Sequence, residues 1–170
     1  RRANAAAAGS GSASGADDHP ESRLLLEHML GGANVRSSAL HVDLSASETC
    51  SADVFLAELC PSGDLNLLLG DFTAPGLATA LPALPTAEIF RSMTAKGFAP
   101  QQILLEINRK LRVQLPIGRF LAAVFVRVSR TLDRVWVVNC GMPELLVLDT
   151  GGIRERIPSV GLPLGIEAEI

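Results

Sequence analysis

Aromatic side chains are scarce in this sequence of 170 residues: Phe and Trp together make up 4% of it, and Tyr is absent. Proteins that hold single-stranded nucleic acids stack the bases on such rings. The sequence also lacks a block of Lys and Arg, and its net charge is −3, whereas nucleic-acid binding depends on clustered positive charge. These absences argue against nucleic acid as a partner and predict a core built mainly from Leu, Val, Ile and Ala.

Long apolar runs are also missing. None approaches the roughly 20 residues that a membrane-spanning helix requires, and no secretory signal pattern is present. The three cysteines, Cys50, Cys60 and Cys140, are odd in number and lack the spacing of a metal-binding motif. Reduced thiols of this kind are typical of cytosolic proteins. We therefore expect a cytoplasmic protein without a membrane partner.

Motifs for several common chemistries are absent as well. The sequence contains no Gly-rich phosphate loop, no paired zinc motif and no nucleophile elbow. Cys140 lies beside Gly141, where a nucleophile is conceivable, but His19, His28 and His41 all lie near the start of the chain. A Cys-His mechanism, which needs a base beside the thiol, is therefore not favoured.

The composition divides the chain into two parts. Residues 1–20 are dominated by Ala, Gly and Ser, which is typical of a flexible linker or of an ordinary disordered terminus. Residues 21–170 have the length of one domain, and a hydrophobic content of 48% over the whole chain allows a core. Because the chain opens on Arg and on linker composition, we expect a fragment that follows another domain.

Hydrophobic periodicity and turn residues predict a mixture of strands and helices. Pro82 and Pro85 are expected to break the helical stretch that begins near residue 75, and Thr86 to cap a cleaner helix that ends at Gly97. The apolar run at 65–69 is expected to be a strand covered on both faces. The remaining predicted elements are a helix at 20–30 and strands at 35–44, 51–60, 64–72, 120–128, 134–139 and 145–148.

The last predicted helix has the clearest pattern. It opens at Pro100, and Ile103, Ile107 and Leu111 follow at intervals of four residues to form its core face. Together, the order of strands and helices predicts an α+β fold, a layered sandwich of antiparallel β-sheets flanked by helices, and not an alternating nucleotide-binding fold.

One turn carries the main functional hypothesis. The Pro-Ser-Gly segment at 61–63 suits a three-residue hairpin loop that pairs Cys60 with Asp64. Counting back equally along both strands from that pair places Asp53 opposite Asp71. Directly opposed side chains have Cβ atoms about 5 Å apart, where like charges repel. A hard divalent cation would relieve this repulsion, because it takes oxygen ligands from carboxylates, carbonyls and water.

Simpler interpretations of the two carboxylates stay open. Asp71 could help to cap the helical stretch that follows it, and Asp53 could be an ordinary exposed strand residue. A hairpin loop of another length would also shift the pairing by one or two residues.

Several segments match one protein family in the same order along the chain. Residues 50–53 (Cys-Ser-Ala-Asp) resemble its Ser-Gly-Asp segment, and residues 70–77 (Gly-Asp-Phe-Thr-Ala-Pro-Gly-Leu) resemble its Gly-Asp-Phe-Thr-Gly-His-Gly-Leu segment. Similar segments recur at 89–94, 106–111, 139–143 and 162–166. From about residue 45 onward the chain thus resembles the bacterial branch of the PPM-type serine/threonine phosphatases, the sporulation stage II E and sigma-regulator group.

This resemblance implies a sandwich of two antiparallel sheets flanked by helices. It also implies that Asp53 and Asp71 are the catalytic, metal-binding residues for two divalent ions, Mn²⁺ or Mg²⁺, and that the carbonyl of Phe72 is a further ligand. Such ions activate a water and screen the phosphoryl oxygens, so that no protein nucleophile is needed. Thr73 and Asn139 are expected as neighbours of the site.

The resemblance further implies a metal-dependent protein serine/threonine phosphatase in bacterial signalling. The implied substrate is a phosphorylated regulatory protein of the anti-sigma-factor antagonist type, in sigma-factor partner switching or a two-component pathway. An upstream sensor or receiver domain in the same chain is implied as well.

Departures from the family pattern favour an alternative. Ala52 replaces a glycine, and Ala74 and Pro75 replace a Gly-His pair. The family's final metal aspartate, in a Ser-Asp-Gly segment, is expected beyond Ile170, and alanine occupies positions 122 and 123, where another aspartate is expected. The alternative is a catalytically inactive phosphatase-like interaction module that binds a signalling partner.

Overall fold

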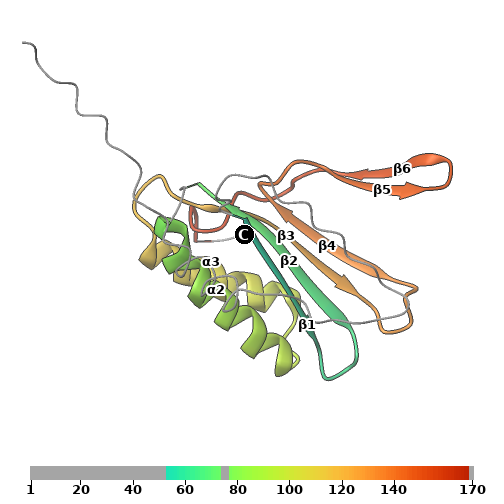
Figure 1. Ribbon diagram of the computed structural model, residues 1–170, viewed down its shortest axis with the longest axis horizontal. Helices are drawn as coiled ribbons and strands as arrows, with labels where there is room; N and C mark the ends of the chain where they lie inside the picture. The colour runs from blue at the N-terminus through green and yellow to red at the C-terminus, as the bar shows by residue number, and fades with distance from the viewer. Residues whose placement is uncertain (1–52, 74–76, 169–170) are drawn as a thin grey trace, which may run out of the picture.

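The computed structural model describes residues 53–73 and 77–168 (Figure 1). The predicted linker at 1–20, the helix at 20–30 and the strand at 35–44 lie outside these residues, as do Ala52, Ala74 and Pro75.

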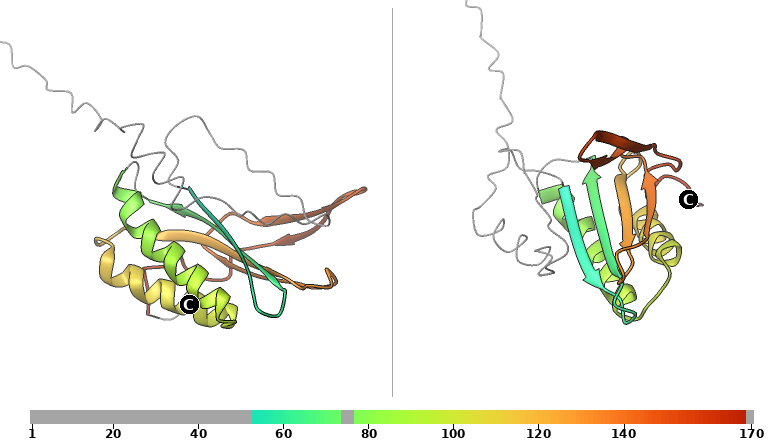
Figure 2. Two further views of the ribbon diagram at one scale, coloured as in Figure 1. Left: turned by 60° about the horizontal axis from the view of Figure 1, so that its bottom comes forward. Right: turned by 90° about the vertical axis from the view of Figure 1, so that its right-hand side faces the viewer.

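The described residues form two antiparallel sheets and two helices, which confirms the predicted α+β class. The strands are β1 (Asp53–Leu59), β2 (Leu65–Phe72), β3 (Leu121–Val128), β4 (Val135–Cys140), β5 (Leu145–Asp149) and β6 (Gly152–Ile157), and the helices are α2 (Leu77–Ala95) and α3 (Pro100–Gln114). Strands β1 to β4 form one sheet in sequence order, while β5 and β6 pair as a ribbon that extends away from the helices (Figures 1 and 2). Neither described helix combines the length and apolar character needed to cross a bilayer.

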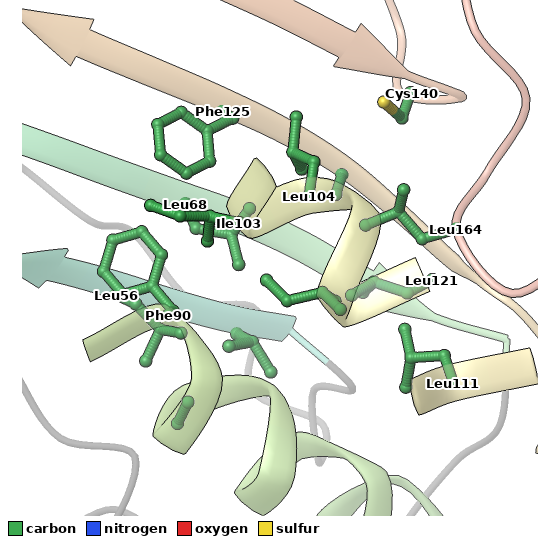
Figure 3. Close-up of a cluster of buried hydrophobic side chains, with 14 of the residues drawn as sticks. Leu56, Leu68, Phe90, Ile103, Leu104, Leu111, Leu121, Phe125, Cys140 and Leu164 are labelled. Carbon is green, nitrogen blue, oxygen red and sulfur yellow. The ribbon is translucent and has the colours of Figure 1, made fainter. Parts of the chain in front are cut away.

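The core lies between the two helices and one face of the four-stranded sheet (Figure 2). Phe90 of α2 and Phe125 of β3 are completely buried, with ring centroids 5.7 Å apart (Figure 3). The predicted core face of α3 is confirmed, because Ile103, Ile107 and Leu111 have no exposed surface. Aliphatic side chains thus supply most of the core, as the shortage of aromatic residues predicts.

The prediction that proline divides α2 into pieces is wrong. The helix continues through Pro82 and Pro85, and Thr86 is an interior residue whose hydroxyl donates a hydrogen bond of 2.8 Å to the Pro82 carbonyl. Each proline removes one main-chain donor. Ala83 and Ala87, on the same stretch, are buried against the core, and this tertiary packing stabilises a helix that its sequence alone would interrupt.

The expectation that the strand at 65–69 is covered on both faces is also wrong. Leu68 is fully buried beneath the helices, whereas Leu67 is half-buried and Leu69 is 37% exposed. Successive side chains alternate between the two faces of a strand, and within the described residues the helices cover only one of them. The sheet therefore has a helix-covered face and an open face.

Candidate metal centre

The hairpin between β1 and β2 has the predicted three-residue loop. The Cys60 N–H donates to the Asp64 carbonyl at 2.8 Å, and the Gly63 N–H donates to the Cys60 carbonyl at 2.9 Å. Gly63 has a φ of +87°, the left-handed conformation expected of the bulge position. The resulting register pairs Asp53 with Asp71, which confirms the predicted opposition of the two residues.

The two carboxylates lie on the open face of the sheet, at the end where β1 begins and β2 finishes. Both residues are exposed. Partial desolvation raises the pKa of Asp71, and the negative charge of Asp53 raises it further. Each effect disfavours the ionised form, so a cation placed here would lower the energy of the pair.

The next residue on β2 contributes through its main chain. The Phe72 side chain is 3% exposed and packs in the core on the helix-covered face, so it takes no part on the open face. Its carbonyl remains as the expected metal ligand. Two carboxylates and a carbonyl are the hard oxygen donors that Mg²⁺ and Mn²⁺ accept, and they fit one ion whose other positions are filled by water.

The described residues supply no larger ligand cluster. Within 53–73 and 77–168, no group of three or more His, Cys, Asp or Glu side chains could hold a metal ion. The cap interpretation of Asp71 is wrong, because this residue lies inside β2 and α2 begins only at Leu77. The metal role of Asp53, Asp71 and Phe72 stays a prediction.

Of the two expected neighbours, only Thr73 lies at this end of the sheet, directly after Phe72. Asn139 lies on β4, two strands away from β2, and is buried. Its amide donates to the Pro143 carbonyl at 2.9 Å and accepts from the Met142 N–H at 3.0 Å. Asn139 therefore holds the turn after β4 and is not brought to the two carboxylates.

Cys140 follows Asn139 and is also buried. Burial raises the pKa of its thiol to about 11. Because the thiolate is the reactive form, this environment argues against a nucleophilic role for Cys140, as the sequence suggests. Cys60 and Cys140 are both free thiols, as expected.

One residue beside the site has no warning in the sequence. Arg119, just before β3, donates a guanidinium hydrogen bond to the carbonyl of Thr73. The two residues are 46 positions apart, and an isolated Arg after the turn at Gly118 matches no motif. Only the pairing of β2 with β3 brings them together.

Comparisons with known proteins place this geometry in a family. The family described as stage II sporulation protein E (SpoIIE) matches residues 61–170, more than half of the chain. The phosphoserine phosphatase RsbP of Bacillus subtilis (strain 168) is 20% identical over 126 residues, which cover 72% of this chain and 31% of that protein. The chain thus spans about a third of the length of this curated relative.

Two solved structures have a similar fold. The crystal structure of the RsbU and RsbW domains of a Mycobacterium tuberculosis protein superposes with a TM-score of 0.58 and 24% identity, over 71% of this chain and 34% of that one. The crystal structure of a bacterial serine phosphatase variant gives a TM-score of 0.56 and 17% identity, over 71% and 61%. On the evidence of the family match, the chain belongs to the stage II sporulation protein E family of PPM-type phosphatase domains.

Proposed function

We propose that the protein containing this chain is a metal-dependent protein serine/threonine phosphatase that acts in bacterial signalling in the cytoplasm. The observation that carries this proposal is the opposition of Asp53 and Asp71 at one end of the sheet. A repulsive carboxylate pair has a clear purpose where a divalent cation binds. The names of the relatives support the same activity, because one is a phosphoserine phosphatase and another a bacterial serine phosphatase.

Each residue of the proposed centre has a distinct task. Asp53 and Asp71 hold the cation with their carboxylates, and the Phe72 main chain orients it with a carbonyl oxygen. When bound, divalent ions supply the Lewis acidity and the charge screening that phosphoryl transfer needs. No protein nucleophile is required, which agrees with the raised pKa of the buried Cys140 thiol.

The proposed substrate is a phosphorylated regulatory protein of the anti-sigma-factor antagonist type. The similar structure that holds RsbU and RsbW domains in one protein supports this class, as does the likeness to RsbP. An upstream sensor or receiver domain in the same chain remains part of the proposal, and the composition of residues 1–20 suits the linker to such a domain.

The test of this function is a Mn²⁺ titration by calorimetry, with hydrolysis of a phosphoserine peptide measured in parallel. Asp53→Asn and Asp71→Asn should each weaken Mn²⁺ binding at least about tenfold, since even groups behind metal ligands commonly contribute that much. Both variants should lose the metal-dependent hydrolysis that the wild type shows.

Glu88→Gln is the matched control. Glu88 is exposed on α2, so this change removes one negative charge without touching the open face of the sheet. It should leave Mn²⁺ affinity unchanged. Unaltered Mn²⁺ binding in Asp71→Asn, or an equal loss in Glu88→Gln, would contradict the proposed centre.

The alternative, a catalytically inactive interaction module, is favoured by the small donor set among the described residues. Measuring hydrolysis on this chain and on any longer natural form separates the two functions. Metal-dependent turnover in either one supports the enzyme. Absence of turnover and of Mn²⁺ binding in both, with retained binding of a signalling protein, supports the module.

A further inference from the structure

The segment just after the candidate metal ligands is held by an unusual number of bonds to one short stretch. The Thr73 N–H donates to the Phe120 carbonyl at 3.2 Å, and the Phe120 N–H donates back to the Thr73 hydroxyl at 3.1 Å. The Arg119 guanidinium donates to the Thr73 carbonyl. We call this set of contacts between Thr73 and the pair Arg119 and Phe120 the Thr73 clamp.

The clamp fixes the direction of the Phe72 carbonyl. The peptide between Phe72 and Thr73 is trans, so its N–H and its carbonyl point in opposite directions. The N–H is bonded to Phe120, on the β3 side of β2. The carbonyl is therefore directed to the opposite side, where β1 begins with Asp53.

This direction is the one that a shared cation requires. Asp53 lies on β1 and Asp71 on β2, so an ion between their carboxylates lies toward the β1 side of Phe72. Rotation of the 72–73 peptide would turn the carbonyl away from that position and would break the bonds to Phe120. The clamp thus holds a main-chain ligand in place before any ion binds.

Arg119 contributes the charged bond of the clamp. A hydrogen bond from a guanidinium is about twice as strong as one between neutral groups. Arg119 is exposed, and it approaches from the loop that follows Gly118, whose φ is +81°. The segment that holds Thr73 is in turn anchored in the core, because Leu121 and Leu164 exchange two main-chain hydrogen bonds of 2.8 and 2.9 Å.

We propose that Arg119 is a positioning residue for the metal centre, which keeps the Phe72 carbonyl aimed at the cation through its bond to Thr73. The inference rests on the proposed function, because it assigns Arg119 a role toward the same ion. Arg119 does not bind the ion, and its own positive charge would by itself repel a cation. Positioning and simple charge therefore predict opposite effects when the guanidinium is removed.

The experiment compares Arg119→Met, Arg119→Lys and the control Arg112→Met with the wild type. Arg112 is an exposed basic residue in the last turn of α3, and its substitution removes the same charge away from the clamp. Two quantities are measured: Mn²⁺ affinity by calorimetry, and amide hydrogen exchange at Thr73 in the metal-free protein.

Arg119→Met should weaken Mn²⁺ binding about tenfold, the usual effect of losing a group behind a metal ligand, and should accelerate exchange at Thr73. Arg119→Lys, which keeps one charged donor, should recover part of both. Arg112→Met should change neither quantity.

Equal or tighter Mn²⁺ binding by Arg119→Met, with wild-type binding intact, would overturn the positioning role and leave the proposed function standing. Unchanged hydrogen exchange at Thr73 would overturn the role as well. Absence of Mn²⁺ binding in the wild type would instead overturn the metal centre itself, and with it this role for Arg119.

Discussion

Asp71 is the residue whose ionisation the fold changes most clearly at the candidate site. Desolvation and the nearby charge of Asp53 raise its pKa in the folded protein above the value of about 3.9 found in unfolded chains. The folded state therefore holds the Asp71 proton more tightly than the unfolded state does. Stability from this group is fully present below the unfolded pKa and is lost as the pH rises through the folded pKa.

This sign gives a prediction for the metal-free protein. Asp71→Asn removes the ionisable group, so it should raise the free energy of unfolding at pH 7 and should have little effect near pH 3, where Asp71 is protonated. Urea unfolding in the presence of a chelator measures both values. A variant that is less stable than the wild type at pH 7 would show that the carboxylate pair is not a source of repulsion.

At the scale of elements, the turn after β4 depends on a close approach of two segments. Gly141 has a φ of +85°, and a Cβ on it would lie 2.4 Å from Cγ and 2.8 Å from Cδ of Pro163. The proline ring cannot rotate away as a flexible side chain would. Gly118 has a similar φ of +81°, but a Cβ there meets no heavy atom within 4 Å.

These two glycines therefore separate backbone strain from steric overlap. Gly118→Ala should destabilise the protein by about 1 kcal/mol, the cost of a left-handed conformation. Gly141→Ala should cost about 3 kcal/mol or more, because overpacking adds to the same strain. Chemical denaturation of both variants tests this, and equal losses would show that the turn can relax around Pro163.

At the scale of the whole molecule, Asn108 ties α3 to the last described segment of the chain. It is 1% exposed; its amide donates to the Glu167 carbonyl at 2.9 Å, and its Oδ1 accepts from the Gly165 N–H at 2.7 Å. Leu164 beside this segment is fully buried in the core and bridges to Leu121 (Figure 3). One side chain thus joins parts of the chain that are nearly 60 residues apart.

Asn108→Ala should lower the free energy of unfolding by about 3 kcal/mol, since it leaves two main-chain groups without their partner. Gln101→Ala, at an exposed position of the same helix, should change it by less than about 0.5 kcal/mol. A loss below 1 kcal/mol in Asn108→Ala would indicate that water replaces the amide.

The sequence was sufficient where the cause of a structure is local. The loop at 61–63 sets the hairpin register through the geometry of a few residues, so the opposition of Asp53 and Asp71 could be predicted from counting. The core face of α3 follows from the spacing of Ile103, Ile107 and Leu111 in the same way.

Where distant parts of the chain meet, the sequence was not sufficient. Packing of α2 on the sheet keeps one helix across Pro82 and Pro85, against their local preference. The pairing of β2 with β3 places Arg119 on Thr73, and no pattern within either segment specifies that contact.

By itself, then, the sequence determined the fold class, the family likeness and the pair of carboxylates, because turns and amphipathic spacing act over a few residues. Tertiary structure alone decided which face of the sheet is open, where Asn139 is used and how the Phe72 carbonyl is aimed. Those outcomes depend on hydrogen bonds and packing between segments whose relative positions exist only after the chain has folded.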